Sequence, residues 1–456
     1  MLKRSERVFA AVLAGTMAMS MAACGKKEEA KTAEKAELGV TFDQIQLDGT
    51  DKDLKAELKF LTHKTDKVDT TFKTYVEEFN KEYPNISIEY EGISDYAEGI
   101  TTRLATGDWG DICMIPTTVD KDELANYFTC MGDLEALSKE YTMLLNYSYD
   151  GKVYGIPSMG NTSGIVYNKA VFEKAGVTEV PKTPDEFLDA LQKIKDNTDA
   201  IPLYTNFAAG WTMTAWDAYI DACATGQADF AHEGRVKGAN PFADRGDKTG
   251  PYAVYDTLYE AVARKLTEDD PTTTDWEGSK ARLNNGEIGC MALGSWSIIQ
   301  MKEASSHPDD VAYMPFPISI DGKQYSTVAP DYNYGINCNS SADEQKAAMI
   351  YIKWLVEKSG FETDEGGVPI QVNAELPEFL QAFDGVELLY DVPVPAGEEN
   401  LGNDVNNESE LGINVSGDMA KTVVEAAIDG APSMEEIAAG WNEKWTAAQE
   451  KFGIAK

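Results

Sequence analysis

The sequence predicts an α/β protein with two or three domains. Its 456 residues exceed the usual length of one domain. Strand and helix patterns alternate between Ala56 and Ile115, and capping motifs introduce helices later in the chain. Because 43% of the residues are apolar and 10% are aromatic, the chain can bury large cores.

The first 23 residues have the layout of a secretory signal. Lys3, Arg4 and Arg7 precede an apolar run at 8–23 that is too short to span a bilayer. Residues 1–23 are therefore expected to direct export.

The signal ends with small residues directly before Cys24, which resembles the lipobox of bacterial lipoproteins. This predicts that Cys24 is lipidated; the alternative is an ordinary cleavage site beside an incidental cysteine. Residues 24–54 contain Phe42 as their only aromatic residue, and we expect them to form a lipidated flexible tether. Acyl chains would hold the protein on the membrane.

Charge and cysteine usage narrow the function classes. A net charge of −37 argues against nucleic acid or anionic lipid as a direct ligand. The five cysteines after Cys24 lack metal-ligand spacing, and an odd number cannot all pair internally. We expect mostly buried thiols, with a Cys113–Cys130 disulfide as the alternative, and neither a cofactor nor a metal.

The segment from Ala56 to Ile115 alternates between apolar strand and amphipathic helix patterns. Strands and helices connected in this way form parallel sheets with right-handed crossovers. The loops after Thr62 and Ile115 should then lie at one edge, where such sheets bind ligands. The expected elements are a strand at 56–62, a helix from Asp69 or Thr70 to Tyr83, a strand at 86–90, a helix at 94–105 and a strand at 111–115.

Gly151–Lys169 changes character in its middle. A strand-like part ends at Pro157 and an apolar run resumes at Ile165, with small and polar residues between them. We interpret the segment as a crossing between two bodies of the protein, where Gly160 and Gly164 bend the backbone.

Three capping boxes predict later helices. Thr183–Glu186, Ser341–Glu344 and Ser433–Glu436 each place a capping hydroxyl three residues before a glutamate. The less regular region at 226–275 is expected to hold surface loops and one helix around Tyr252–Leu266.

Hydrolase chemistry has little support in the motifs. The chain has three histidines, without HExxH or GxSxG. A glycosidase carboxylate pair stays open as an alternative, although carboxylates are abundant throughout this acidic chain.

The tryptophans fall into two groups. Trp354, Trp441 and Trp445 occupy inward positions of predicted helices and should pack in cores. Trp211 and Trp296 stand close to glycines in expected loops, where they could stack on sugar rings. The alternative for these two is ordinary loop packing.

Taken together, these features resemble the extracellular solute-binding proteins (family 1) of carbohydrate ABC transporters, and the layout is similar to that of maltose-binding protein. The resemblance covers nearly the whole chain after the tether. It rests on the lipobox and on Thr106–Ile112, Gly151–Lys169, Asn285–Met291, Gly294–Trp296 and Tyr334–Asn337.

The resemblance implies a two-lobe, periplasmic-binding-protein-like α/β fold. Each lobe would be a mixed, mostly parallel sheet flanked by helices, with the ligand cleft between the lobes. Lobe 1 would comprise 55–158 and 330–362, and lobe 2 would comprise 162–326 and 366–456. Gly151–Lys169 would hold the first hinge and Thr327–Asp331 the second.

The resemblance also implies the ligand-binding residues. Ile115 and Asn161 replace an aromatic and an acidic residue of maltose-binding protein, which argues against maltose as the ligand. The residues expected at the cleft are His63, Asp66, Thr117, Thr118, Asn161, Trp211, Trp296, Asp331, Tyr332 and Gln371.

The implied function is a non-enzymatic receptor, monomeric and lipid-anchored on the extracellular side of the cytoplasmic membrane. It would capture a sugar, more specifically an oligosaccharide, and deliver it to an ABC transporter permease. The alternatives are a receptor of the same fold for a peptide, polyamine or other solute, and a surface glycosidase.

Overall fold

The computed structural model describes residues 38–94 and 96–454, which form a mixed α/β fold. The predicted signal at 1–23, Cys24 and the beginning of the predicted tether lie outside this range. No helix of the described residues is long and apolar enough to cross a membrane.

The sheet of lobe 1 has the strand order β2-β1-β3-β13-β7. β1 pairs in parallel with β2 and β3, as predicted, whereas β13 is antiparallel to β3 and β7. The strands are β1 (Ala56–Thr62), β2 (Ile86–Gly92), β3 (Ile112–Met114), β7 (Ile156–Pro157) and β13 (Asn333–Ile336).

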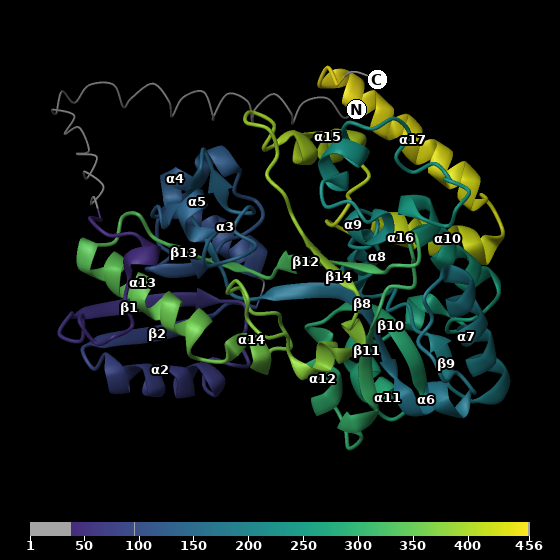
Figure 1. The fold of residues 1–456 in the computed structure, drawn as a ribbon, viewed down its shortest axis with the longest axis horizontal. Helices are drawn as coiled ribbons and strands as arrows, with labels where there is room; N and C mark the ends of the chain where they lie inside the picture. Colours follow the sequence, from purple (N-terminus) through teal and green to yellow (C-terminus); the bar gives the residue numbers. More distant parts are fainter. Residues whose placement is uncertain (1–37, 95, 455–456) are drawn as a thin grey trace, which may run out of the picture. The chain divides into compact units, whose positions relative to one another are not determined.

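Amphipathic helices cover this sheet (Figure 1). α2 (Thr71–Glu82) buries Phe72, Tyr75 and Phe79, which share one face at helical spacing. α3 (Tyr96–Thr106) connects β2 to β3, and α13 (Ala342–Glu357) packs on β1 and α2. The predicted capping box of α13 is present.

The structure corrects the predicted tether. Phe42 is completely buried, its N–H donates to the carbonyl of Met131 at 2.7 Å, and its ring packs against that of Tyr141. Asp51 pairs with Lys346 of α13 at 2.6 Å. Residues 38–54 therefore belong to lobe 1. Phe42, Ile45 and other apolar residues of this segment pack on the core, and their burial orders a segment whose composition resembles a linker.

The sheet of lobe 2 has the order β14-β12-β8-β10-β9, and β11 also pairs with β8. The long central β8 is antiparallel to β10, β11 and β12, while β9 and β14 pair in parallel. The strands are β8 (Gly160–Asn168), β9 (Ile201–Leu203), β10 (Ile288–Gly294), β11 (Val311–Pro315), β12 (Tyr325–Pro330) and β14 (Glu387–Tyr390).

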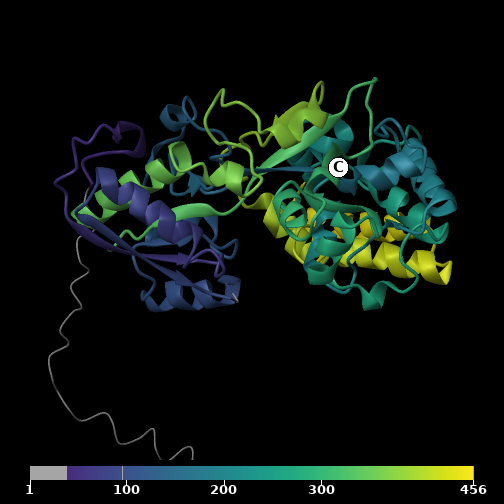
Figure 2. The same cartoon turned by 90° about the horizontal axis from the view of Figure 1, so that it is seen from below.

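Long helices surround the second core. α7 (Pro184–Asn197) and α17 (Met434–Lys451) begin at the predicted caps, and Trp445 of α17 is fully buried. Figure 2 shows α17 in yellow along lobe 2. α10 (Gly250–Ala263) corresponds to the helix predicted around Tyr252–Leu266, and α16 (Asp418–Asp429) packs on α10.

Shorter elements complete the described chain. In lobe 1 and its connections they are η1 (Phe42–Gln44), η2 (Lys121–Glu123), α4 (Leu124–Tyr127), β4 (Gly132–Asp133), α5 (Leu134–Leu137), β5 (Ser148–Tyr149), β6 (Lys152–Val153) and α14 (Phe361–Asp364). In lobe 2 they are α6 (Lys169–Lys174), η3 (Gly210–Met213), α8 (Thr214–Asp217), α9 (Ala222–Thr225), η4 (Phe230–Val236), η5 (Pro271–Thr273), α11 (Trp276–Asn284), α12 (Ser297–Glu303), η6 (Pro308–Asp310), η7 (Glu378–Phe383) and α15 (Leu401–Ser409).

Three chain segments cross between the lobes and hydrogen-bond to one another. The N–H of Asp331 donates to the carbonyl of Met159 at 2.9 Å. Gly160 and Val368 exchange two backbone bonds of 2.8 and 2.7 Å. The start of β8 is thus held between the other two crossings.

The third crossing shifts one predicted boundary. Ile370 accepts a backbone bond from Thr142, and Val372 donates one to Glu140, both in lobe 1. The start of the second part of lobe 2 at residue 366 was therefore predicted too early.

Gly160 and Gly164 do not bend the backbone. Both lie inside β8, and neither has a positive φ. A Cβ at Gly164 would lie 2.4 Å from the carbonyl oxygen of Met314, and one at Gly160 would lie 2.7 Å from the sulfur of Met143. The glycines permit close packing rather than an unusual turn.

The Cys113–Cys130 disulfide considered above is not formed. Cys113 is buried in β3 and Cys130 is exposed, and both are free thiols. Cys223, Cys290 and Cys338 are also free and buried, as expected of small apolar side chains.

Candidate functional site

His63 lies directly after β1, at the predicted edge of the lobe 1 sheet. Its ring lies 4.4 Å from the ring of Tyr332 and 5.9 Å from that of Tyr96, measured between centroids. Burial lowers the pKa of His63 to about 4, against the raising effect of Asp331. His63 is therefore neutral at pH 7.

Two lysines follow His63, and both pair with one carboxylate. Lys64 and Lys67 place their ammonium groups 2.5 and 3.3 Å from Glu365, just after α14. Burial opposes the charge of Glu365, but the two lysines outweigh burial and hold its pKa below the usual value. The sequence did not indicate this triad, because 301 residues separate Lys64 from Glu365.

Asn161 and Asp331 meet where the first two crossings pair. The amide nitrogen of Asn161 lies 3.4 Å from a carboxylate oxygen of Asp331, a weak hydrogen bond. Asp331 is followed by Tyr332, whose ring contacts the ring of His63.

Unpaired polar atoms collect at these crossings. Within the described part of the chain, six buried side-chain oxygens lack a hydrogen-bond partner. Four belong to crossing segments: Ser158 Oγ, Asn161 Oδ1, Thr327 Oγ1 and Asn333 Oδ1. Buried oxygens without partners are costly, so this concentration marks the crossings as polar and incompletely hydrogen-bonded.

A backbone link joins Asn161 to an aromatic cluster. The next residue, Thr162, exchanges hydrogen bonds of 3.0 and 3.1 Å with Ser295. Trp296 follows Ser295 and leads into α12.

Three tryptophans form this cluster. Trp211 in η3 is 52% exposed, and its ring centroid lies 5.7 Å from that of the half-buried Trp296. Trp276, the first residue of α11, lies 5.3 Å from Trp211 and 5.7 Å from Trp296. The sequence prediction did not include Trp276, whose immediate neighbours Asp275 and Glu277 are both charged.

We call the connected set His63, Tyr332, Asp331, Asn161, Trp296 and Trp211 the hinge row. The structure brings these six predicted residues together from both lobes and the crossings.

The other four predicted residues do not share the ring contacts and hydrogen bonds of the hinge row, although the charge of Asp66 acts to raise the pKa of His63. Asp66, Thr117 and Thr118 are exposed on the loops after β1 and β3, and Thr118 contacts Thr101 of α3. Gln371 pairs with Tyr141 of lobe 1.

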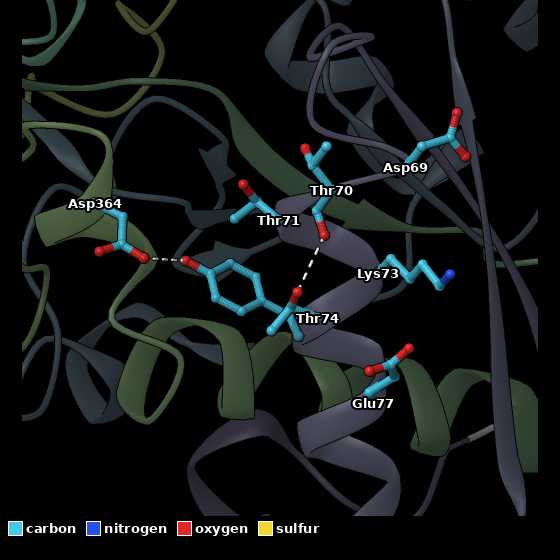
Figure 3. Close-up of a pocket in the computed structure, with 8 residues that line it drawn as sticks. Asp69, Thr70, Thr71, Lys73, Thr74, Glu77 and Asp364 are labelled. Atoms are coloured by element: carbon cyan, nitrogen blue, oxygen red, sulfur yellow. Dashed lines mark hydrogen bonds between the residues drawn. The ribbon is translucent and has the colours of Figure 1, made fainter. Parts of the chain in front are cut away.

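Two surface pockets lie elsewhere. A pocket of about 580 Å³ lies at the start of α2 and is closed on one side by Asp364 (Figure 3). Tyr75, which also lines it, donates its hydroxyl hydrogen to Asp364 at 2.6 Å. A second, of about 630 Å³, lies along α17 between Asn240 and Glu450. No residue of the hinge row lines either pocket. Among the described residues, no group of three His, Cys, Asp or Glu side chains could hold a metal ion.

The chain is similar to proteins of known binding function. Over 337 residues it is 25% identical to the multiple sugar-binding protein of Streptococcus mutans, a match that covers 70% of this chain and 76% of that protein.

Solved structures show the same fold. One is a manno-oligosaccharide-specific solute-binding protein of Bifidobacterium animalis subsp. lactis in complex with mannotriose. It is 47% identical, with a TM-score of 0.85 over 91% of this chain and 99% of that one. A binding protein of an ABC transporter from the same organism, in complex with mannobiose, matches with the same identity, coverage and TM-score.

The family comparison agrees with these structures, and it confirms the resemblance seen in the sequence. Residues 64–360 match the model of the bacterial extracellular solute-binding proteins. This range begins one residue after His63 and includes the first two crossings and the tryptophan cluster. This chain is a member of that family.

Proposed function

We propose that this protein captures a manno-oligosaccharide outside the cell and delivers it to the permease of an ABC transporter. The observation that carries this proposal is the 47% identity, over 91% of the chain, to a solute-binding protein in complex with mannotriose. The aligned residues span both lobes, and the two proteins share sequence as well as fold.

The hinge row has the chemistry that such a ligand needs. A sugar ring presents C–H faces that stack on aromatic rings and a rim of hydroxyls that hydrogen-bond to polar groups. Trp211 and Trp296 supply the aromatic surface in lobe 2. The unpaired Asn161 Oδ1 at the first crossing can accept a hydrogen bond from a sugar hydroxyl. Asp331 and Tyr332 would complete the polar side, and we retain Asp66, Thr117, Thr118 and Gln371 as outer contacts.

Charge favours a neutral sugar. Glu365 pairs with both lysines beside the row, His63 is neutral, and Asp331 adds a carboxylate at the crossing. This carboxylate would repel an anionic sugar at the crossing.

The cellular arrangement is part of the same proposal. Lipidation at Cys24 would attach the chain to the extracellular side of the cytoplasmic membrane, and the sugar would pass to the permease when both lobes hold it. Binding energy that favours one arrangement of the two lobes would signal the loaded state.

Calorimetry of residues 38–456 tests the proposal. We expect mannobiose and mannotriose to bind at least tenfold more tightly than maltotriose and raffinose. Heat with another sugar alone would replace the ligand class, and heat with a peptide or polyamine but no sugar would favour the alternative receptor. Chromatography of the mixtures should show uncleaved sugar; released product would instead indicate a glycosidase.

A further inference from the structure

The three tryptophans touch one another, and this limits how a sugar can bind. The planes of Trp211 and Trp296 are inclined by 38°, with 5.7 Å between their centroids. A ring inserted between two aromatic faces needs a carbon contact of about 3.5–4 Å on each side, roughly 7–8 Å in total. No sugar ring fits between these two indoles, so they form one continuous platform.

The accessible part of this platform belongs to Trp211. Its side chain is 52% exposed, whereas Trp296 is half-buried against the core. A sugar ring can therefore stack on the open side of Trp211, and Trp296 extends the surface toward Asn161.

Trp276 has a different environment. It stands nearly perpendicular to Trp211, at 82°, and at 66° to Trp296. The ammonium group of Lys280 lies 4.8 Å from the ring centroid of Trp276 and pairs with Glu277 at 2.9 Å. One face of Trp276 is thus occupied, and the ring also packs against the hydrophobic core and contacts the other two tryptophans.

Trp276 is also held firmly at its backbone. Asp275, the preceding residue, donates its N–H to the hydroxyl of the buried Tyr204 at 2.8 Å, and Ser279 donates its hydroxyl to the carbonyl of Trp276 at 2.7 Å. Trp211 lies in the short η3 turn, where its carbonyl accepts a hydrogen bond of 2.7 Å from the hydroxyl of Thr214. A fixed side chain that contacts two others can set their orientation.

We propose that Trp276 is a positioning residue that holds Trp211 and Trp296 as a single platform, open on one side, for a neutral oligosaccharide. This inference rests on the proposed sugar-binding function. It assigns Trp276 an effect on affinity through the other two tryptophans and not through contact with the sugar.

The test combines single and double variants. In Trp276→Ala we expect an affinity for mannotriose about tenfold lower than in the wild type, within the range for coupled neighbours. The affinity of Trp276→Phe should stay within about threefold of the wild type, because an aromatic ring still packs beside Trp211 and Trp296. Since Trp276 acts in part through Trp211, the affinity loss in Trp276→Ala combined with Trp211→Ala should be smaller than the sum of the two single losses.

Circular dichroism of the ligand-free protein supplies an independent reading. Close indoles couple their electronic transitions, so Trp276→Phe should reduce the coupled tryptophan signal. Trp354→Phe, which removes a buried tryptophan of lobe 1, is the matched control and should leave that signal unchanged. This measurement needs no sugar, so it tests the cluster even if the proposed function fails.

Two results would overturn the inference. One is unchanged affinity in Trp276→Ala together with an unchanged spectrum in Trp276→Phe. The other is an affinity loss that adds fully to that of Trp211→Ala, which would mean that Trp276 contacts the sugar directly. Absence of mannotriose binding in the wild type would reject the proposed function itself.

Discussion

The two ends of the hinge row differ in the side chains that limit their charge. In lobe 1, titratable side chains surround His63, but burial keeps His63 neutral and Glu365 pairs with Lys64 and Lys67. In lobe 2, three tryptophans form the surface. The difference suggests a division of roles, in which lobe 2 supplies contact area and lobe 1 selects against charge.

The largest effect should come from the aromatic end. Trp211→Ala should weaken mannotriose binding by about 1–3 kcal/mol, the scale of an aromatic hot spot. Its melting temperature should change little, because the side chain is 52% exposed. Calorimetry of binding and of unfolding checks both statements.

Phe452→Ala, which removes a 40% exposed ring of the same lobe, is the control. Equal affinity in the two variants would show that lobe 2 does not supply the contact area. Trp296→Ala should lose both affinity and stability, because Trp296 also packs against the core.

The second-largest effect on affinity is expected at the crossing between the two ends of the hinge row. Asn161→Ala should lower affinity by about 1–2 kcal/mol, the value of a buried hydrogen bond to ligand. Stability should hardly change, because Oδ1 has no protein partner and the contact with Asp331 is 3.4 Å long. Asn197→Ala on the exposed side of α7 should leave binding intact. A drop in melting temperature without a change in affinity would make Asn161 a structural residue.

A smaller effect is expected on the preference for neutral over acidic sugars. Glu365→Gln releases Lys64 and Lys67 from their partner, so an oligosaccharide containing a uronic acid should bind about fivefold more tightly. High salt should reduce this gain. Binding of neutral mannotriose should stay within about twofold.

Glu287→Gln removes an exposed carboxylate paired with Arg282 and serves as the control for Glu365→Gln. If both variants respond equally to the acidic sugar, the selection arises from overall charge and not from the triad in lobe 1.

The smallest effect concerns stability against pH. Burial lowers the pKa of His63 from 6.5 to about 4, so between these values the unfolded chain binds more protons. Stability from this group is therefore lost as the pH falls from 6.5 toward 4. His63→Gln should make the decline in melting temperature between pH 7 and pH 5 shallower by about 1–2 °C. His307→Gln, at an exposed histidine, should leave the slope unchanged.

Asp217 of lobe 2 should act in the opposite direction. It is buried beside Tyr255 and the N–H of Asn414, and burial raises its pKa to about 6. The folded protein then binds more protons between about pH 4 and 6, so this group's contribution falls as the pH rises. Asp217→Asn should shift the pH slope in the direction opposite to that of His63→Gln; parallel shifts would contradict the difference between the lobes.

Local patterns allowed much of the fold to be predicted. The β1–α2–β2–α3–β3 order follows from hydrophobic periodicity, and the helices begun by Thr183, Ser341 and Ser433 follow from side chains only three residues apart. All residues that form each of these patterns lie within one short segment of the sequence, so the patterns can be recognised without knowledge of the tertiary contacts.

The site was predictable only in part, because its contacts join distant segments. Glycine neighbours drew attention to Trp211 and Trp296, but Trp276 meets them only after α11 has packed. The pairing of Lys64 with Glu365 and that of Gln371 with Tyr141 likewise depend on the path of the third crossing. Residues 38–54 were misjudged because their composition resembled a linker, whereas Phe42 is buried.

If Cys24 is lipidated as proposed, the burial of Phe42 sets the length of the linker between the membrane and lobe 1. A fully extended chain gains at most about 3.5 Å per residue. From a lipidated Cys24, a free chain ending at residue 54 would reach roughly 100 Å, whereas one ending at Phe42 reaches only about 60 Å. This linker would end on lobe 1. Lobe 1 would therefore stay near the point of lipid attachment, while lobe 2 changes position around the sugar. Lengthening the segment between Cys24 and Phe42 would then enlarge the volume accessible to the anchored protein and lower its effective concentration near the proposed permease.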